Sequence, residues 1–391
     1  MNLLDVHPAL LISALILTLS ILCSIIKLIK SSSNTNTPPG PRGFPIVGYL
    51  PFLRRDLHHL LTELSHQYGP IFKLRLGDKL WIVINSPSLL KEWRSLRKIF
   101  VREMLSNNNL KATYNLRKDE ELQKKPPLLQ RVDEIIEDTI HEWMKNPHDK
   151  PLTNDGRTDF MQILVDLMRE EDNKASLGKI QIKALIVFFG TDTSATTIEW
   201  AMTELLNHPE MMEKVQQELN EVVGLNNIVE EFHIPKLDYL DAVLKETLRM
   251  HPVLPLSPRN PSQSCTVGGY TIPKGSTVLV NIWSVQMDPL AWDNPSEFRP
   301  ERFLGNNGKW DFSGNDLNYI PFRSGRRACA GIPLAERMVR YILASFLHSY
   351  EWRLPDEEKL DMSDKLLTTL RKRIPLIVVP APRLSRSDLY E

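Results

Sequence analysis

The sequence predicts a mainly α-helical protein with small β-sheets. Apolar side chains recur at helical spacing over long segments, most clearly at Lys179–His208, His208–Val223 and Ile332–Ser349. Shorter runs rich in β-branched and aromatic residues, such as Ile71–Leu76 and Leu80–Ile84, have the length and pattern of strands. Because the helical segments are much longer than the strand-like ones, helices should dominate the fold.

The strand-like runs predict hairpins and a small sheet. A helical pattern at Leu57–Gln67 leads into the first two runs, and Gly77-Asp78 between them is a hairpin signal. A second hairpin is expected at Thr266–Ile272, and a further strand at Ile374–Val379.

Composition excludes some functions and leaves others open. The 391 residues, 42% of them hydrophobic, allow either one large domain or two or three smaller ones. Lys plus Arg equals Asp plus Glu at 48 each, so no charge excess favours nucleic-acid binding. The three cysteines, Cys23, Cys265 and Cys329, are far apart and odd in number, which argues against disulfides and for a reducing compartment.

An uncharged segment near the N-terminus predicts a membrane anchor over residues 1–30. Ala9–Ile26 spans roughly 27 Å as a helix, enough to cross a bilayer. Lys27 and Lys30 follow it and no Lys or Arg precedes it, which places the bulk of the chain in the cytosol. A cleaved signal peptide is the alternative, but the basic leader and the cleavage site that it needs are missing.

Residues 31–50 follow as a polar spacer and a proline-rich hinge. The prolines of Pro38–Pro45 fix the backbone φ angle and stiffen the exit from the membrane. Residues 51–391 then form the main domain.

A glycine-punctuated basic loop, Pro321–Gly331, ends on a cysteine that opens an apolar helix. Arg326, Arg327 and the free N–H groups of the helix start favour the thiolate form of Cys329, the form that binds metals. A buried, inert cysteine is the alternative.

The spacing Phe-x-x-Gly-x-Arg-x-Cys-x-Gly resembles the haem-binding loop of the cytochrome P450 superfamily. Its five fixed positions are Phe322, Gly325, Arg327, Cys329 and Gly331. The resemblance implies a P450 fold with haem b as cofactor and the Cys329 thiolate as the axial ligand of the haem iron. It further implies that Arg327 contacts a haem propionate and that Phe322 packs under the ring.

Three further motifs occur in the order typical of that superfamily. Gly-x-Asp-Thr-Ser resembles the oxygen-activation motif, which implies catalytic proton delivery by Asp192 and Thr193. Hydroxyls bonding back to helical carbonyls at a kink are the alternative. Glu-x-x-Arg and Pro-Glu-Arg-Phe resemble the buried cluster that holds the cysteine loop, here Glu246, Arg249 and Arg302, whereas a surface ion pair is the alternative.

Three residues resemble the superfamily's propionate contacts. Trp93 and Arg97 lie one helical turn apart, and Arg259 follows a proline-rich extended run. The alternatives are an Arg that covers a half-buried Trp, and a solvated loop Arg.

The chain also departs from the family pattern. Arg323 occupies a position where the family has a small residue, so a positive φ there would carry a cost. Phe189 replaces a small residue beside the oxygen-activation motif. Segments that normally roof the substrate pocket are missing around Leu89–Glu92 and after Arg117–Gln123.

Residues Tyr239–Lys245 and Ala330–Glu336 resemble the plant terpenoid- and flavonoid-oxidising branch. The resemblance implies a monooxygenase of the endoplasmic reticulum membrane, with its catalytic domain on the cytosolic face. It implies O2, a small hydrophobic substrate and NADPH–cytochrome P450 reductase as partners, the latter steered by Arg323, Arg326 and Arg327. The alternative is a non-catalytic truncated remnant or splice product that keeps the haem-binding core and acts as a binding protein.

Overall fold

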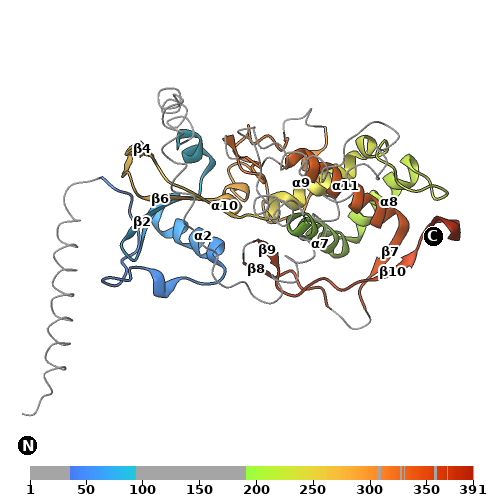
Figure 1. Ribbon diagram of the computed structural model, residues 1–391, viewed down its shortest axis with the longest axis horizontal. Helices are drawn as coiled ribbons and strands as arrows, with labels where there is room; N and C mark the ends of the chain where they lie inside the picture. The colour runs from blue at the N-terminus through green and yellow to red at the C-terminus, as the bar shows by residue number, and fades with distance from the viewer. Residues whose placement is uncertain are drawn as a thin grey trace, which may run out of the picture. The chain divides into compact units, whose positions relative to one another are not determined.

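The computed structural model describes most of the chain outside its N-terminus and a central segment (Figure 1). The described residues are 36–93, 191–305, 310–325, 328–329, 331–355, 359–367 and 369–390. The chain divides into two compact units, one made of Met1–Arg102 with Ala195–Glu391 and the other of Glu103–Ser194. Almost all the described elements therefore belong to the first unit.

A four-stranded sheet lies in the N-terminal part of this unit. Its strands are β1 (Ile71–Leu76), β2 (Lys79–Ile84), β6 (Thr277–Asn281) and β3 (Leu256–Arg259), in the order β1-β2-β6-β3. The β1–β2 and β3–β6 pairs are antiparallel, whereas β2 and β6 run parallel. The parallel pair β2 and β6 thus joins segments nearly 200 residues apart in the chain. Parallel strands require a long crossover connection between them.

Both faces of the sheet are covered. Ile82 and Ile84 of β2 pack in one apolar cluster with Trp93, whereas Val83 between them packs in another with Leu61. This alternation follows from the two-residue side-chain period of a strand. A strand buried on both faces is expected to be apolar throughout, as Leu80–Ile84 is.

The helix α2 (Leu57–Tyr68) covers one of these faces (Figure 1). Leu57, Leu60, Leu61 and Leu64 recur at the helical period and pack in the same cluster as the sheet. Gly69 follows the helix with a φ of 96°, a conformation that glycine adopts without steric cost.

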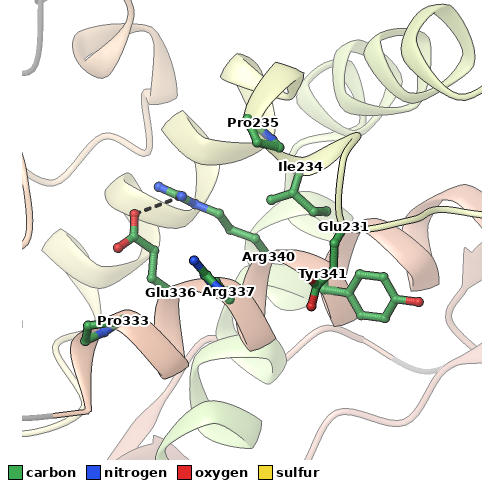
Figure 2. A pocket seen from close by; sticks show the side chains of 8 residues that line it. All are labelled: Glu231, Ile234, Pro235, Pro333, Glu336, Arg337, Arg340 and Tyr341. Carbon is green, nitrogen blue, oxygen red and sulfur yellow. Dashed lines mark ion pairs between the residues drawn. The ribbon is translucent and has the colours of Figure 1, made fainter. Parts of the chain in front are cut away.

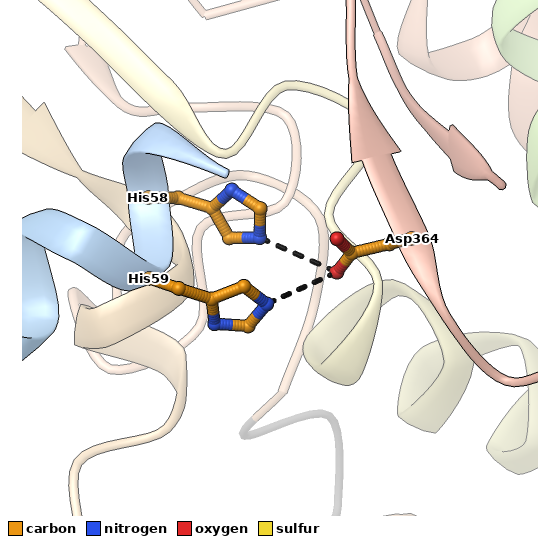
Figure 3. A group of neighbouring side chains, drawn as sticks. All are labelled: His58, His59 and Asp364. Atoms are coloured by element: carbon orange, nitrogen blue, oxygen red, sulfur yellow. Dashed lines mark hydrogen bonds and ion pairs between the residues drawn. The ribbon is translucent and has the colours of Figure 1, made fainter. Parts of the chain in front are cut away.

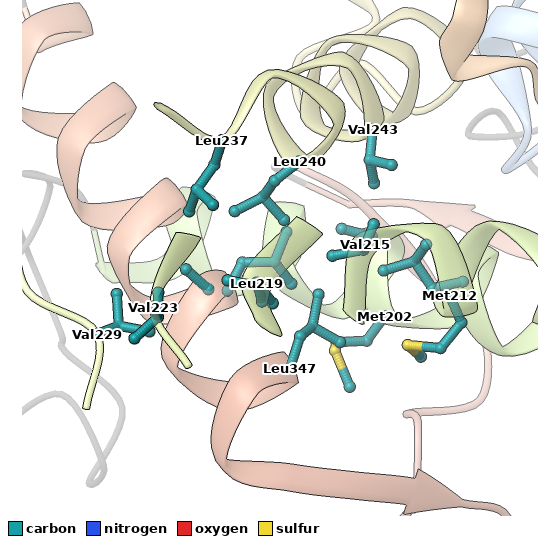
Figure 4. Packing of buried hydrophobic residues seen from close by; sticks show 14 of the residues in the cluster. Met202, Met212, Val215, Leu219, Val223, Val229, Leu237, Leu240, Val243 and Leu347 are labelled. Carbon is teal, nitrogen blue, oxygen red and sulfur yellow. The ribbon is translucent and has the colours of Figure 1, made fainter. Parts of the chain in front are cut away.

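The second part of the unit is helical. It contains α7 (Thr191–Asn207), α8 (Pro209–Val222), α9 (Asp238–Met250) and α11 (Ile332–Ser349), and Figure 1 shows them gathered together. Their apolar faces meet in one core, drawn in Figure 4, where side chains such as Leu219 and Leu240 are almost fully buried. The helices are therefore held by tertiary burial, which supplies most of the stability of amphipathic helices in proteins.

Short elements connect these parts. They are η1 (Leu50–Phe52), η3 (Ile234–Lys236), α10 (Ile282–Gln286), η4 (Pro300–Phe303) and η6 (Ser387–Tyr390). Three antiparallel pairs complete the described structure, namely β4 (Cys265–Val267) with β5 (Tyr270–Ile272), β8 (Asp364–Leu366) with β9 (Leu370–Lys372), and β7 (Tyr350–Arg353) with β10 (Val379–Pro382).

The prediction of a mainly helical protein with small sheets is confirmed. The helix expected at Ile332–Ser349 has those bounds, and the two predicted hairpins form at β1–β2 and β4–β5. The pattern over Lys179–His208 is described only from Thr191, where α7 runs through the polar residues Thr191–Ser194 as regular helix.

The strand predicted at Ile374–Val379 is wrong. Only Val379 lies in a strand, and the backbone before it is irregular. Pro375 has no N–H to donate to a neighbouring strand. The N–H of Leu376 instead donates to Glu199 Oε1 at 2.9 Å, so a side chain takes the role of a strand partner.

Within the described part of the chain, no helix has both the length and the apolar character needed to cross a membrane. The anchor expected over residues 1–30 lies outside the described residues.

Candidate functional site

Cys329 lies three residues before the first residue of α11, Ile332, where it is exposed and forms no disulfide. The loop closes on itself beneath it: the N–H of Cys329 donates to the carbonyl of Phe322 at 3.0 Å, and that of Ala328 to the carbonyl of Gly325 at 2.9 Å. These bonds fix the backbone at Cys329. Because the residue is exposed, the alternative of a buried cysteine does not apply to it.

Two residues in the turn before Cys329 have a left-handed backbone conformation. Gly325 has a φ of 73° and Arg323 a φ of 69°. Glycine adopts this conformation freely, whereas an L-residue with a Cβ pays a steric cost. Arg323 thus carries the strain that its departure from the family pattern implied, and its Nε is buried without a hydrogen-bond partner.

Gly314 supports the other side of this turn. A Cβ at Gly314 would lie 2.3 Å from the carbonyl oxygen of Arg323 and 3.0 Å from the Cα of Ser324. Only glycine therefore allows the two backbone segments to approach this closely. Gly314 was not predicted from the sequence. The local pattern that indicates a turn at Gly314 is the polar run Ser313–Asp316.

Phe322 enters the loop from an aromatic core. Its ring meets Phe312 edge-on with centroids 5.2 Å apart, and it packs at the border of a cluster that contains Trp292, Trp310 and Tyr319. Edge-to-face pairs of this kind are the preferred geometry of aromatic rings. The start of the cysteine loop is thus fixed by packing.

Glu246, Arg249 and Arg302 are brought together, and the surface ion-pair alternative does not apply to them. Arg249 donates to both carboxylate oxygens of Glu246, at 2.7 and 2.9 Å, and Arg302 Nε donates to Oε1 at 2.9 Å. The backbone N–H of Arg299 adds a third donor to that oxygen, at 2.9 Å. The side chains of Glu246 and Arg249 have no exposed surface, and that of Arg302 is 6% exposed.

The remaining guanidinium donors of this cluster also find acceptors. Arg249 donates to the carbonyl of Gln286 at 3.2 Å, and Arg302 to that of Asp293 at 2.9 Å. Burial lowers the pKa of Arg302, while the Glu246 carboxylate acts to raise it. A buried ion cluster is tolerated when its hydrogen bonds are satisfied in this way.

Two residues that the sequence analysis missed connect the cluster's helix to the cysteine loop. Gln286 donates to the carbonyls of Leu248 and Arg249 at 3.0 Å each, and its Oε1 accepts from the N–H of Ile320 at 2.8 Å. Tyr319, whose ring is buried, donates to the carbonyl of Lys245 at 3.0 Å. Burial raises the pKa of Tyr319 well above its usual value, so the phenol remains a donor. Together these bonds fix Ile320 and hence the first residues of the loop on α9.

The structure describes some of the other site residues predicted from the sequence. Asp192 and Thr193 are in the first described turn of α7, within the smaller unit. Trp93 is 7% exposed and packs in the sheet's apolar cluster, and Arg259 ends β3 and donates to the carbonyl of Pro258 at 3.1 Å. Arg97, Arg327 and Phe189 lie outside the described residues.

A cavity of about 460 Å³ opens between η3 and α11 (Figure 2). Its walls carry Glu231, Arg337 and an ion pair of 2.8 Å between Glu336 and Arg340. None of the described residues predicted to bind the cofactor lines it. The remaining wall is formed by Ile234, Pro235, Pro333 and Tyr341.

Cys329 fits a metal-ligating thiolate. It is free and exposed, and Gly331 leaves room beside it, because a Cβ there would lie 3.7 Å from the sulfur. A reactive or ligating cysteine needs such access and a helix start nearby, and α11 begins at Ile332.

Comparison with known proteins agrees with this arrangement. The family model described as "Cytochrome P450" matches residues 38–119 and 121–378. A flavonoid 3′-monooxygenase of Crocosmia x crocosmiiflora is 32% identical over 484 residues, covering 91% of this chain and 94% of the relative. The sugiol synthase of Salvia miltiorrhiza is 30% identical over 479 residues, covering 90% and 96%.

A solved structure supports the fold. A zebra fish cytochrome P450, in a structure with abiraterone, matches with a TM-score of 0.60 and 25% identity, covering 83% of this chain and 99% of that one. The alignment to the Crocosmia relative spans 484 positions, more than the 391 residues of this chain. It therefore includes positions of the relative that this chain lacks. The chain belongs to the cytochrome P450 family of haem-thiolate monooxygenases, in a form that is internally shorter than its plant relatives.

Proposed function

We propose that this chain is a monooxygenase of the endoplasmic reticulum membrane that inserts one oxygen atom of O2 into a small phenolic or terpenoid metabolite. Its electrons come from NADPH through NADPH–cytochrome P450 reductase. The catalytic domain faces the cytosol, held by an anchor over residues 1–30 and a hinge over residues 31–50. The uncharged run Ala9–Ile26 and the lysines that follow it support this placement.

One observation carries the proposal. Cys329 is an exposed, free thiol at the start of α11, held by a loop that Gln286 and Tyr319 tie to α9. A haem bound through a thiolate supplies the chemistry of dioxygen activation. Among the family's site residues, Cys329 would bind the iron, and Phe322, Gly325, Arg327 and Gly331 would shape the loop around it.

Other residues hold the cofactor and move protons. Trp93, Arg97 and Arg259 would bind its propionates, and neutralisation of those carboxylates by the two Arg side chains would stabilise the bound group. The carboxyl group of Asp192 and the hydroxyl of Thr193, both in the first described turn of α7, would relay protons to the site. Groups positioned in this way raise the rate of a proton-dependent step by general acid catalysis.

Glu246, Arg249 and Arg302 position the cysteine loop and take no part in the chemistry. Their described bonds run among themselves, to backbone groups and to the sulfur of Met287, so these side chains are engaged within the fold. Loss of one partner would act on cofactor retention, because the loop depends on α9 for its position.

The substrate class follows from the relatives. The Crocosmia protein is named for a flavonoid and the Salvia protein for sugiol, and both match more than nine-tenths of their own length. A protein of the same family with this degree of identity is expected to oxidise a small plant metabolite of phenolic or terpenoid type. The missing segments fall around Leu89–Glu92 and after Arg117–Gln123, in regions that shape the substrate pocket in the family.

The second candidate is a shortened, non-catalytic chain that retains the haem-binding core and acts as a binding protein. The alignment with the Crocosmia relative spans 484 positions, whereas this chain has 391 residues, so the chain lacks segments of that relative, which favours this candidate. Phe189 in place of a small residue favours it too. A bulky ring beside the oxygen-activation motif would restrict the space for a substrate.

Turnover separates the two candidates. The full chain would be reconstituted with NADPH–cytochrome P450 reductase in lipid vesicles and given NADPH, isotopically labelled O2 and a panel of small phenolics and terpenoids. A product that carries one labelled oxygen atom supports the monooxygenase, provided that the Cys329→Ser variant forms none. A chain that binds haem through Cys329 and forms no product across the panel, while a full-length relative does so under the same conditions, supports the binding protein.

A further inference from the structure

Two histidines and one aspartate converge at a site away from the cysteine loop. His58 and His59 belong to the first turn of α2, and Asp364 is the first residue of β8. Figure 3 shows both imidazole rings directed at the carboxylate. Their Nε2 atoms lie 3.4 and 3.2 Å from Asp364 Oδ2, although the residues are more than 300 positions apart in the chain.

These two distances lie at or just beyond the long end of the range for N–H···O hydrogen bonds, about 3.2 Å. Charge-assisted N–H···O bonds are about 2.7–2.9 Å. The same chain contains such a bond, because His251 Nε2 lies 2.6 Å from Glu204 Oε1. The carboxylate of Asp364 is thus approached by two nitrogens, and neither comes as close as His251 comes to Glu204.

The distances instead match the separation of atoms that bind the same metal ion. Zinc binds His nitrogen and Asp oxygen at about 2.0–2.1 Å, so two ligands at tetrahedral corners lie about 3.3–3.4 Å apart. The observed separations of 3.4 and 3.2 Å match that edge. The three ligand atoms all lie within 4.8 Å of one another, which leaves room for a small cation between them.

His58 also lacks a good partner. Its side chain has no exposed surface, and its one polar contact is that of 3.4 Å between Nε2 and Asp364 Oδ2, because its Nδ1 makes no hydrogen bond. A buried imidazole with so few hydrogen bonds is unusual, because buried polar groups are mostly well paired. A metal at Nε2 would give this buried imidazole a strong interaction.

Packing against Trp283 holds the imidazole rings of His58 and His59 in place. The indole of Trp283 meets the ring of His59 edge-on with centroids 4.6 Å apart, and that of His58 with centroids 5.7 Å apart. Side chains held in place by packing make a precise ligand set. The site is therefore organised before an ion arrives.

Solvent reaches the cluster through a cavity of about 330 Å³. His59, whose side chain is 36% exposed, and Asp364 line it together with the carboxylate of Asp56 and the guanidinium of Arg373. The cavity gives an ion a path of entry and leaves its fourth corner open to water. Three protein ligands and a water are the usual set at an open zinc site.

We propose that His58, His59 and Asp364 form a binding site for Zn²⁺ that ties α2 to the β8–β9 hairpin. The site takes a borderline divalent ion because its donors are two imidazoles and one carboxylate. It is separate from the cysteine loop, and it does not depend on the proposed monooxygenase function.

The test measures zinc on the haem-loaded full chain, purified in detergent without a histidine tag and stripped with a chelator. After addition of Zn²⁺ and removal of the excess, the wild-type chain should retain one zinc per chain beside the haem iron. His59→Gln and Asp364→Asn should each weaken zinc binding at least about 100-fold, since loss of mere supporting groups already costs 10–100-fold. The exposed His66 on the same helix supplies the control, and His66→Gln should retain zinc.

Zinc-edge X-ray absorption of the wild-type chain gives a readout that does not depend on any variant. Nitrogen and oxygen neighbours at about 2.0 Å, with the scattering pattern of two imidazoles, are expected. A sulfur neighbour at about 2.3 Å would place the zinc on a cysteine and overturn the proposal. Absence of retained zinc would overturn it too, as would equal retention by wild type and both ligand variants.

Discussion

The backbone N–H of Ile320 donates a hydrogen bond of 2.8 Å to the side-chain oxygen of Gln286, two residues before the cysteine loop turns at Phe322. The amide nitrogen of Gln286 donates to the last turn of α9, at the carbonyls of Leu248 and Arg249. One buried side chain thus connects the helix that carries the Glu246 cluster to the loop that presents Cys329.

Replacing this side chain should weaken both the fold and the site. Gln286→Leu leaves the N–H of Ile320 and two carbonyls without their partner, and each unsatisfied buried group costs about 1–3 kcal/mol. We expect the free energy of unfolding, measured by urea denaturation of the haem-loaded chain, to fall by at least about 3 kcal/mol, with a lower haem content after purification. Gln217→Leu on the exposed face of α8 is the control and should change stability by less than about 0.5 kcal/mol. Equal effects of the two substitutions would contradict the role of Gln286.

The buried charge cluster should respond to loss of its carboxylate. Glu246→Gln leaves Arg249 buried beside Arg302 without a counter-charge, and breaking a buried pair in this way costs about 3–5 kcal/mol. Urea denaturation of the haem-loaded variant measures the loss. The exposed Glu213 of α8 offers a matched control, for which the same substitution should be close to neutral. A loss below about 1 kcal/mol for Glu246→Gln would show that the cluster behaves as a surface ion pair.

The left-handed backbone at Arg323 should make glycine the better residue there. Arg323→Gly and Arg323→Ala remove the same functional group and differ only in the Cβ, which carries the steric cost at a φ of 69°. The Gly variant should be more stable than the Ala variant by about 1 kcal/mol. At Arg337, exposed on α11, the order should reverse, because glycine costs about 1 kcal/mol in a helix. If the Ala variant is the more stable one at both positions, the backbone strain at Arg323 is absent.

His348 should make the protein less stable in mild acid. Burial lowers the pKa of His348 from its usual 6.5, while its Nε2 donates to the carbonyl of Asn227 at 3.1 Å. The unfolded chain therefore takes up a proton at this residue before the folded chain does, so the free energy of unfolding falls as the pH drops below 6.5. His348→Gln should flatten the slope of stability against pH between pH 7 and 5, measured by urea denaturation at each pH.

The control for this slope is the exposed His66. Because other groups also titrate in this range, the informative quantity is the difference in slope between a variant and the wild type. His66→Gln should leave the slope unchanged. A His348→Gln variant with the wild-type slope would contradict the assignment.

Local sequence patterns predicted the elements whose side chains repeat with a clear period. Ile332–Ser349 has a continuous helical pattern, and Gly77-Asp78 sets the β1–β2 turn, so both were predicted correctly. The prediction failed at Ile374–Val379, where apolar residues stand in irregular backbone held by Glu199. Apolar content alone does not specify a strand when a side chain from another helix supplies the hydrogen-bond partner.

The candidate site likewise contains residues that the sequence predicted and residues that it did not. Glu246, Arg249 and Arg302 were named from motifs, and the structure brings them together. Gln286 and Gly314 were not named from the sequence. Gln286 acts through its contact with Ile320, and Gly314 through its close approach to the carbonyl of Arg323, and no local spacing encodes either contact. Burial of a polar side chain and close backbone approach are tertiary properties, and they become visible only once the elements are packed.

The central claim is that Cys329 binds the haem iron as a thiolate. The most direct test is the absorption spectrum of the full chain after loading with haem, reduction and addition of carbon monoxide. We predict the strongly red-shifted Soret band of a thiolate-ligated haem in the wild type and its loss in Cys329→Ser, with Cys265→Ser as the matched control that keeps it. A wild-type band at the position typical of histidine-ligated or unligated haem would contradict the claim.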